Sequence, residues 1–376
     1  MSPGLYIHVP FCRSKCPYCA FYSIPSPSLI PIWLDGLKKE ILLYKGQLDP
    51  FDSLYVGGGT PTFLEAGVLA NLMKYLFTHF DFAPDTEVTV EANPCDLTEE
   101  KTETLKYLGV NRVNVGVQSF DDHVLSFLGR RHRVREVKGA LNRLRRFGFE
   151  NVGIDLIYGI KEQGLKGWLH TLHSALAFQP EHISCYQLIF EKKTVFGRLR
   201  DKGQIETLIE SEEATYFLET SQHLEDKGYV HYEISNFAKD DLCRSRHNRK
   251  YWRHIPTLGL GPSAHSFDGK KRWWNVRSIK KYRAAVEKGR PPVEGCENLT
   301  DEQFKIESLA LGLRTSAGID LGTVSRIPQS DAALSSLQAS GLVKVIDGRV
   351  IPTREGFLVA DQLPVCFFEG SISNPA

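Results

Sequence analysis

Three cysteines within eight residues are the part of this chain whose types and spacing are best suited to chemistry. They are spaced Cys12-x3-Cys16-x2-Cys19 and directly follow a short apolar segment, 4–9. Thiolates are soft ligands that suit iron–sulfur clusters, zinc or copper(I). A structural zinc site usually has two separated cysteine pairs, and the sequence holds no second pair. Cys16-Pro-Tyr-Cys19 alone would suit a redox dithiol, which leaves Cys12 without a role.

The third alternative is a [4Fe–4S] cluster with three protein ligands and one open iron. An open iron can chelate a further ligand, as the open position of a catalytic zinc does. The spacing alone does not choose among these three alternatives. The other five cysteines are isolated, and we expect them to behave as small buried apolar side chains; they are Cys95, Cys185, Cys243, Cys296 and Cys366.

The elements that must position these cysteines are short strands alternating with helices. Short apolar or β-branched segments predict six strands, at 4–9, 53–56, 86–91, 112–117, 151–157 and 182–188. Between them lie helical patterns, such as Trp33, Leu37, Ile41 and Tyr44 on one face. The alternation predicts a parallel α/β sheet, either a partial (β/α)6 TIM-like barrel or an open doubly wound sheet. In both, functional residues gather at the carboxyl ends of the strands.

A glycine-rich turn follows the second predicted strand. It contains Gly57, Gly58, Gly59 and Thr60. Glycine lets a backbone approach a ligand closely, and we expect the free N–H groups of Gly58, Gly59 and Thr60 to bind a carboxylate or amine. The spacing of Thr62 and Glu65 predicts a helix capping box immediately afterwards, as does that of Asp96 and Glu99. Gly109 and Gly148 are expected at helix C-termini.

The pattern changes near residue 230, which predicts three parts. These are a core barrel over 1–235, a connecting segment over 236–298, and a small C-terminal domain over 299–376. The last part is mainly helical, with a hairpin centred on Asp347–Gly348, and this order suggests a winged helix.

Composition excludes several classes of protein. The net charge of +1, from 46 basic and 45 acidic residues, gives no global attraction to nucleic acid. No apolar segment approaches the roughly 20 residues needed to span a bilayer, and the start lacks the pattern of a signal peptide. We therefore expect a cytoplasmic protein with reduced thiols.

Several sequence motifs resemble the radical SAM superfamily, and more narrowly its oxygen-independent coproporphyrinogen III oxidase group. The anchors are YIHVPFC (6–12), CPYC (16–19), YVGGGTPT (55–62), VEANP (90–94), VGVQSF (115–120), LGRRH (128–132) and DLIYG (155–159). The resemblance runs through 4–190 and more loosely to about 365. It implies a [4Fe–4S] cluster on the three cysteines and S-adenosyl-L-methionine as cofactor.

The resemblance also implies cofactor-binding roles for polar residues at the strand ends. These are Glu91, Gln118 and Asp155, with Arg130 opposing the cofactor's carboxylate and Tyr6 and Tyr18 close to the cluster. Each has a plainer explanation, a solvated carboxylate or ordinary aromatic packing, when taken alone. The neighbours of Arg130, residues 131–133, are expected to form a solvated basic patch.

Two departures separate this chain from the oxidases. Those enzymes carry a fourth cysteine two residues after the third, where Phe21 stands here, and only five residues precede Tyr6. Both features match a sister group, the HemW-type haem chaperones, as does His247-Asn-Arg-Lys-Tyr-Trp252. That motif predicts His247 as a haem ligand, with aromatic neighbours along the porphyrin and Arg246, Arg249 or Lys250 near its carboxylates. His265 is expected to bind haem or to line the barrel mouth.

The resemblance favours a haem chaperone that binds haem and transfers it to an acceptor protein, respiratory proteins among the candidates. The cluster would then serve structure, dimerisation or electron transfer, so the sequence leans away from an enzyme. The alternative is a coproporphyrinogen III oxidase, in which a 5′-deoxyadenosyl radical abstracts hydrogen from a propionate. Homodimer formation and peripheral membrane contact stay open. An RNA-modifying enzyme is disfavoured by the near-neutral charge.

Overall fold

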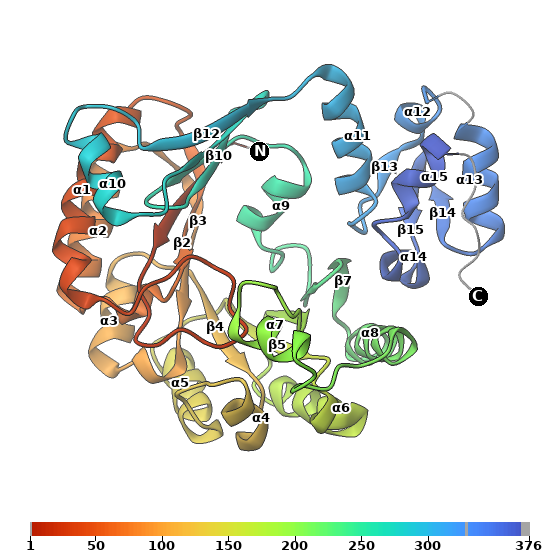
Figure 1. Ribbon diagram of the computed structural model, residues 1–376, viewed down its shortest axis with the longest axis horizontal. Helices are drawn as coiled ribbons and strands as arrows, with labels where there is room; N and C mark the ends of the chain where they lie inside the picture. The colour runs from red at the N-terminus through yellow and green to blue at the C-terminus, as the bar shows by residue number, and fades with distance from the viewer. Residues whose placement is uncertain (1, 328–329, 370–376) are drawn as a thin grey trace.

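Six parallel strands, adjacent in chain order, form the centre of the protein in the computed structural model, which describes residues 2–327 and 330–369 (Figure 1). They are β1 (Gly4–Val9), β2 (Phe51–Gly58), β3 (Phe82–Ala92), β4 (Arg112–Gln118), β5 (Val152–Tyr158) and β6 (His182–Gln187). All six were predicted from the sequence. Their consecutive order is that of a partial (β/α)6 barrel, because a doubly wound sheet would reverse its strand order at an internal switch point.

Helices connect these strands on the outer side of the sheet (Figure 1). They are α1 (Ile30–Tyr44), α2 (Ala66–His79), α3 (Glu99–Tyr107), α4 (Asp122–Phe127), α5 (Val134–Arg146) and α6 (Gly164–Leu176). Two more helices, α7 (Val195–Asp201) and α8 (Glu210–Glu225), follow β6, and α7 contacts the cysteine loop through Phe196 N–H and Pro17 O (3.0 Å). The predicted face of α1, from Trp33 to Tyr44, is buried. Short 3-10 helices, η1 (Pro27–Leu29), η2 (Pro61–Phe63), η3 (Pro94–Asp96) and η4 (Lys161–Gln163), precede four of the crossover helices.

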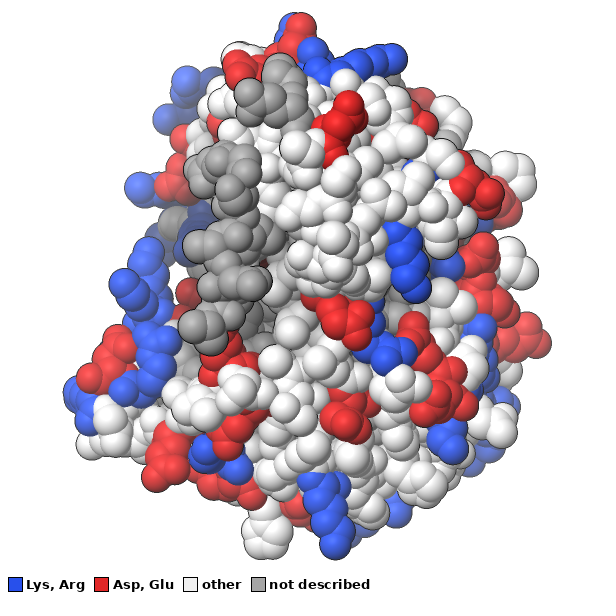
Figure 2. Space-filling model, turned by 90° about the vertical axis from the view of Figure 1, so that its right-hand side faces the viewer, with Lys and Arg blue, Asp and Glu red and all other residues white. Residues whose placement is uncertain are grey.

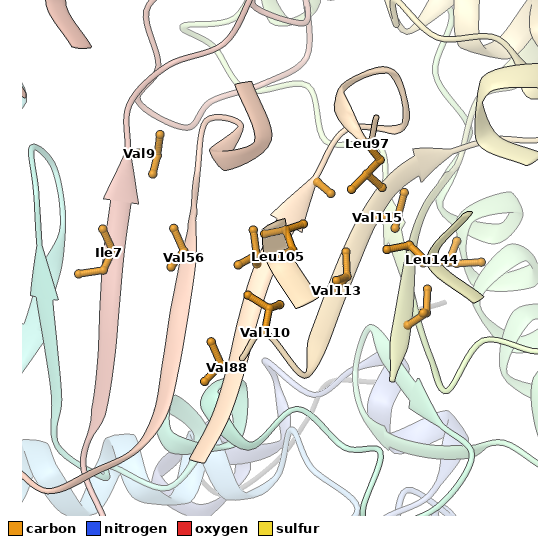
Figure 3. Packing of buried hydrophobic residues seen from close by; sticks show 14 of the residues in the cluster. Ile7, Val9, Val56, Val88, Leu97, Leu105, Val110, Val113, Val115 and Leu144 are labelled. Carbon is orange, nitrogen blue, oxygen red and sulfur yellow. The ribbon is translucent and has the colours of Figure 1, made fainter. Parts of the chain in front are cut away.

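Alternation of side chains along the strands separates the core from the barrel lumen. Figure 3 shows Ile7 and Val9 of β1 and Val113 and Val115 of β4 in the apolar layer, where Leu144 of α5 joins them. Successive residues of a strand point to opposite faces. The residues between these apolar positions therefore face the lumen.

The predicted connecting segment, 236–298, contributes to the same sheet. Its elements, with the strand before them, are β7 (Val230–Glu233), β8 (Asn236–Ala238), α9 (Arg246–Trp252), β9 (Thr257–Leu260), β10 (His265–Phe267), β11 (Lys271–Asn275), α10 (Ile279–Val286) and β12 (Val293–Asn298). β9 pairs parallel with β1, and β8 pairs antiparallel with β6. The sheet thus extends beyond both edges of the six-stranded centre.

The C-terminal module has its own apolar cluster, built from residues such as Leu309, Leu337 and Leu363. Its elements are α11 (Asp301–Gly312), β13 (Ile319–Asp320), α12 (Leu321–Val324), α13 (Ser330–Ala339), β14 (Val343–Ile346), β15 (Arg349–Pro352), α14 (Arg354–Leu358) and α15 (Leu363–Glu369). From α11 to β15 this is the element order of a winged helix. Asp347 and Gly348 both have positive φ, as a two-residue hairpin turn requires. The end-on view of this module shows charges of both signs interspersed with uncharged surface (Figure 2).

Some local predictions were wrong. Neither predicted capping box forms, because Thr62 and Asp96 lie in 3-10 helices; α3 is capped by Thr98, which accepts from Lys101 N–H at 3.2 Å. Gly109 and Gly148 do adopt positive φ after α3 and α5. Among the isolated cysteines, the burial expectation holds for Cys185 and Cys366, fails for exposed Cys296, and is only partly met by Cys95 and Cys243.

A buried carboxylate joins the extended sheet to α1. Glu40 is fully buried, and its Oε2 accepts from Gly261 N–H (2.7 Å) and from the Tyr282 hydroxyl (2.5 Å). Its Oε1 accepts from Asn275 Nδ2 at 2.6 Å. Burial raises the pKa of Glu40 to about 7, and the three hydrogen bonds oppose that shift. This side chain links α1, β11 and α10 at one point.

We expect Glu40→Ala to lower the free energy of unfolding by about 3 kcal/mol, because three buried donors lose their acceptor. Glu103→Ala, at an exposed position of α3, is the matched control and should change it by less than about 0.5 kcal/mol. Urea denaturation followed by circular dichroism measures both. Equal stability of the two variants would contradict this role for Glu40.

Candidate functional site

The three cysteines lie in one loop at the carboxyl end of β1. Two backbone hydrogen bonds close this loop at its base, from Cys12 N–H to Ile24 O (3.3 Å) and from Ile24 N–H to Pro10 O (2.9 Å). Cys12, Cys16 and Cys19 are half-buried, and none forms a disulfide. The loop thus presents three thiols from a single fixed segment.

A cation, the guanidinium of Arg130, lies beside the thiols of this loop, where burial disfavours thiolates. Burial raises the pKa of Cys19, and the nearby thiols of Cys16 and Cys12 add to that shift. The Arg130 guanidinium lies 3.5 Å from Cys16 Sγ and from the Tyr18 hydroxyl, and it donates to Gly116 O at 2.8 Å. A buried cation at this position offsets the negative charge that clustered thiolates would concentrate.

The donor set fits an iron–sulfur cluster better than a single ion. Within residues 2–327 and 330–369, no three His, Cys, Asp or Glu side chains are placed to hold one metal ion together. Each cysteine of a cluster binds a different iron, so the three sulfurs need not converge on a single point. A loop of three soft, half-exposed donors without a fourth meets that requirement.

The glycine-rich turn meets the cysteine loop directly, although not in the way the sequence suggested. A Cβ on Gly59 would lie 2.6 Å from Phe11 O, so only glycine permits this approach. The N–H groups of Gly59 and Thr60 donate to Val9 O and Phe11 O, both at 2.8 Å. The expectation of free N–H groups was therefore wrong. The turn instead fixes the loop, and Thr60 Oγ1 lies 3.3 Å from Cys12 Sγ.

Glu91 lies at the carboxyl end of β3 and faces the lumen. The Tyr55 hydroxyl donates to its Oε1 (2.8 Å), and Gly58 N–H donates to its Oε2 (3.1 Å). Burial raises the pKa of Glu91 to about 7, against the opposing hydrogen bond from Tyr55. A carboxyl group poised between its charged and neutral forms can accept or donate a hydrogen bond to a polar ligand.

Asp155 and Gln118 lie on the neighbouring strands. Asp155 Oδ2 accepts from Asn114 Nδ2 at 2.7 Å, whereas Asn114 Oδ1 is buried without a partner. Gln118 has a φ of 70°, a left-handed backbone that non-glycine residues rarely adopt. Unpaired buried acceptors and local strain are typical of ligand sites. This rim therefore fits a polar cofactor with hydroxyl groups.

Tyr6 lies below the rim and belongs to a chain of hydrogen bonds. Its hydroxyl lies 3.1 Å from His8 Nδ1, and His8 Nε2 donates to Tyr22 O at 2.9 Å. Burial lowers the pKa of His8 to about 4, so its ring is neutral and Nδ1 accepts from Tyr6. The hydroxyl of Tyr6 is thereby directed along β1 toward the cysteine loop.

Two further tyrosines lie beneath the rim. Tyr186 and Tyr251 stay 42% and 45% exposed, and burial of their hydroxyl groups raises the pKa of both well above the usual value. The sequence argument missed Tyr55, Asn114 and Tyr186, although the alternation of polar and apolar residues in β2, β4 and β6 was a usable signal.

His247 does not lie on that rim. It is 1% exposed on α9, near the amino ends of β1 and β2, where its Nδ1 meets Ser53 Oγ (2.9 Å) and its Nε2 meets the Tyr251 hydroxyl (3.0 Å). Burial lowers its pKa to about 3, and the charge of Lys250 acts in the same direction. The imidazole is therefore neutral, as a metal ligand must be, but both nitrogens already have partners.

Other predicted basic contacts are corrected. Lys250 is fully buried and bonded to Asp52, and Arg246 pairs with Asp85, so neither is available to a haem carboxylate in this arrangement. His132 was expected in a solvated patch but is fully buried, with Nε2 bonded to Val117 O at 2.9 Å. His265 is exposed and close enough to His8 to influence its charge, which places it near the barrel mouth.

Comparison with known proteins decides the family. Residues 6–175 match the radical SAM superfamily. The heme chaperone HemW of Bacillus subtilis is 37% identical over 371 residues, covering 95% of this chain and 97% of that protein. The chain belongs to the HemW family of radical SAM proteins. HemW of Synechocystis is 33% identical and covers 91% and 85%, and HemW of Escherichia coli is 33% identical and covers 70% and 69%.

The HemW family shares its fold with a solved oxidase. Coproporphyrinogen III oxidase HemN of Escherichia coli, a radical SAM enzyme, superposes with a TM-score of 0.84 at 25% identity, covering 98% of this chain and 91% of that one. Phe21, at the position where the oxidases were expected to carry a fourth cysteine, is 72% exposed. No helix among the described residues is long and apolar enough to cross a membrane.

We expect Cys16→Ala to lose the visible iron–sulfur absorbance after anaerobic reconstitution, because one of three cluster ligands is gone. Cys296→Ala removes an exposed thiol away from this loop and should keep that absorbance. Absorption spectra and iron analysis of both variants provide the measurement. A Cys16→Ala protein with wild-type absorbance would show that the cysteine assignment is wrong.

Glu91 should make stability depend on pH. Its folded pKa of about 7 lies above its ordinary value of 4.5, so the folded state holds the proton more tightly than the unfolded state. Stability from this group is fully present below pH 4.5 and is lost as the pH rises toward 7. Glu91→Gln lacks this loss, so its stability relative to wild type should rise by up to about 3 kcal/mol over that range. Urea titrations at both ends of the range measure it, and a constant difference would contradict the shift.

Proposed function

We propose that this protein is a haem chaperone, which binds haem and transfers it to an acceptor protein. The observation that carries the proposal is similarity to HemW relatives along nearly the whole chain, 95% of it in the Bacillus subtilis case. A shared barrel alone would not support it, because radical SAM folds serve many functions. The similarity includes α9 and the C-terminal module, which lie outside the matched superfamily segment.

The cofactor site of this proposal is the carboxyl rim of the barrel. Cys12, Cys16 and Cys19 would hold a [4Fe–4S] cluster, and S-adenosyl-L-methionine would bind beside it. When bound, the cluster supplies one-electron chemistry. The proposed contacts of the cofactor are Tyr6, Tyr18, Gly58, Gly59, Thr60, Glu91, Gln118, Arg130 and Asp155. Among them, Glu91 would accept from a polar group, Arg130 would face a carboxylate, and the glycines would allow close approach.

A second candidate is an oxygen-independent coproporphyrinogen III oxidase. The fold shared with HemN favours it. Against it stands Phe21, since the resemblance places the oxidases' fourth cysteine there. In either case this chain's own residues bind, orient and shield the reactants, while the hard chemistry belongs to the cofactor.

His247 keeps its place in the proposal as a haem ligand, on one structural condition. Its Nε2 would have to exchange the Tyr251 hydroxyl for iron, which requires Tyr251 or α9 to move. The opposite nitrogen would stay bonded to Ser53, an arrangement that fixes the tautomer and orientation of metal-bound histidines. The proposal also includes a cytoplasmic location. It is compatible with a homodimer and with peripheral contact to a membrane.

Haemin titrated into the purified protein should produce a saturable Soret band. His247→Ala should weaken that band, because the axial nitrogen is lost. His170→Ala, an exposed histidine of α6, is the control and should bind haemin as wild type does. Thermal unfolding of each variant establishes that it is folded at the temperature of the titration.

The oxidase alternative is tested in parallel. Reconstituted protein is incubated without oxygen with coproporphyrinogen III, S-adenosyl-L-methionine and a reductant. A chaperone forms no protoporphyrinogen above background under these conditions. Multiple-turnover formation of protoporphyrinogen, or a wild-type protein without a saturable Soret band, would overturn the proposed function.

A further inference from the structure

A pocket of about 870 Å³ lies on the side of α9 where the C-terminal module packs. Its walls are the end of α9 and the residues after it (Trp252–His254), one face of α11, and the edge of the three-stranded sheet. α9 and α11 contact each other, and Figure 1 shows α9 between the barrel and the C-terminal module that begins with α11. His247 and Tyr251 of the same helix contact barrel residues instead, so the two sides of α9 serve different spaces.

The pocket combines flat rings with apolar side chains. Trp252 and Phe304 line it, as do Ile319 and Ile351. The His254 ring lies 4.5 Å from the Phe304 ring at an interplanar angle of 34°. The volume of the pocket falls within the usual range of small-molecule sites, roughly 300–1,000 Å³. Such a lining suits a large planar ligand, which can stack against aromatic faces.

Positive charge gathers at the same place. Arg253, Lys305 and Arg349 line the pocket, against one carboxylate, Asp320, whose Oδ1 is occupied in accepting from Thr323 N–H at 3.1 Å. Burial lowers the pKa of Arg253, and the charges of Arg249, Arg244 and Arg349 push it the same way. The nearby Glu307 is engaged with Arg272 and His254. Arg349 donates to Ala317 O (2.6 Å) and Gly318 O (2.8 Å), which holds its guanidinium at the pocket wall without neutralising its charge. A ligand with carboxylates would complement that charge and the charge of Lys305.

The backbone at the pocket is also strained. His254 has a φ of 49°, in the left-handed region that non-glycine residues seldom occupy. Its Nδ1 lies 3.1 Å from Ser308 Oγ, which ties the strained turn after α9 to α11. Strain held in place by surrounding contacts is concentrated at binding sites. The geometry, ring surfaces and charge all meet at one position.

We propose that this pocket binds a flat aromatic ligand bearing carboxylates, and that in this protein the ligand is the porphyrin ring of haem, with its propionates toward Lys305 and Arg349. The inference rests on the proposed function and deepens it. Haem would then be held between α9 and the C-terminal module, apart from the cluster rim, in a second position separate from iron ligation by His247 on the barrel side of α9. The pocket would recognise the ring and its carboxylates and would not need the iron. Binding here therefore differs from binding through an axial ligand, which coordinates the iron.

The test uses haemin and metal-free protoporphyrin IX, titrated into the full-length protein and followed by absorbance and tryptophan quenching. Lys305→Glu reverses an exposed charge at the pocket, and Thr323→Trp fills the pocket without changing charge. Lys280→Glu makes the same charge change on exposed α10 and is the control. Thermal unfolding verifies that the variants fold.

Both porphyrins should bind the wild type, and their Kd should rise about tenfold or more in Lys305→Glu and Thr323→Trp. The control should stay within about twofold of the wild type. Wild-type affinity for haemin in both pocket variants would overturn the pocket and leave the chaperone function standing. Binding of haemin without protoporphyrin IX by the wild type would also overturn it. Absence of binding of either porphyrin to the wild type would defeat the inference together with the proposed function.

Discussion

A β-strand presents successive side chains to opposite faces, and this constraint organises the whole barrel. On the outer face, valine, leucine and isoleucine pack against the crossover helices. On the inner face, the same strands carry Tyr55, Glu91, Asn114 and Asp155 toward the lumen. The apolar layer secures the strands, so the polar residues are held at fixed positions even where their own hydrogen bonding is incomplete. A one-residue slip of any strand would exchange the two sets.

The rim where these strands end depends on a close approach between two loops. Gly59 lies against the backbone of Phe11, which brings Thr60 to Cys12 and sets one end of the cysteine loop. Arg130, arriving from the turn after α4, meets the loop at Cys16. Three separate segments thus meet around the thiols, and none of them could place the sulfurs alone. A rigid rim of this kind lowers the cost of organising a cofactor when it binds.

α9 borders two parts of the molecule, the barrel lumen and the pocket beside the C-terminal module. Its inner side closes the barrel with His247 and Tyr251, and its end opens toward the C-terminal module at Trp252. A short helix with Ser245 as its cap, accepting from Asn248 N–H at 3.2 Å, is thereby shared by both spaces.

The sequence by itself determined the six parallel strands, the three-cysteine loop, the terminal hairpin and the family, because these depend on local spacing and on periodicity. It could place Glu91 near the end of a strand, since strand ends are local features, whereas Asp155, also expected at a strand end, lies in the middle of β5. Only the tertiary structure decided that Gly58, Gly59 and Thr60 have no free N–H, that Lys250 is buried on Asp52, and that His247 faces Ser53 and Tyr251. Apart from Tyr251, which is four residues from His247, the partners in these contacts lie between about 30 and 200 residues away along the chain, and no local pattern encodes such contacts.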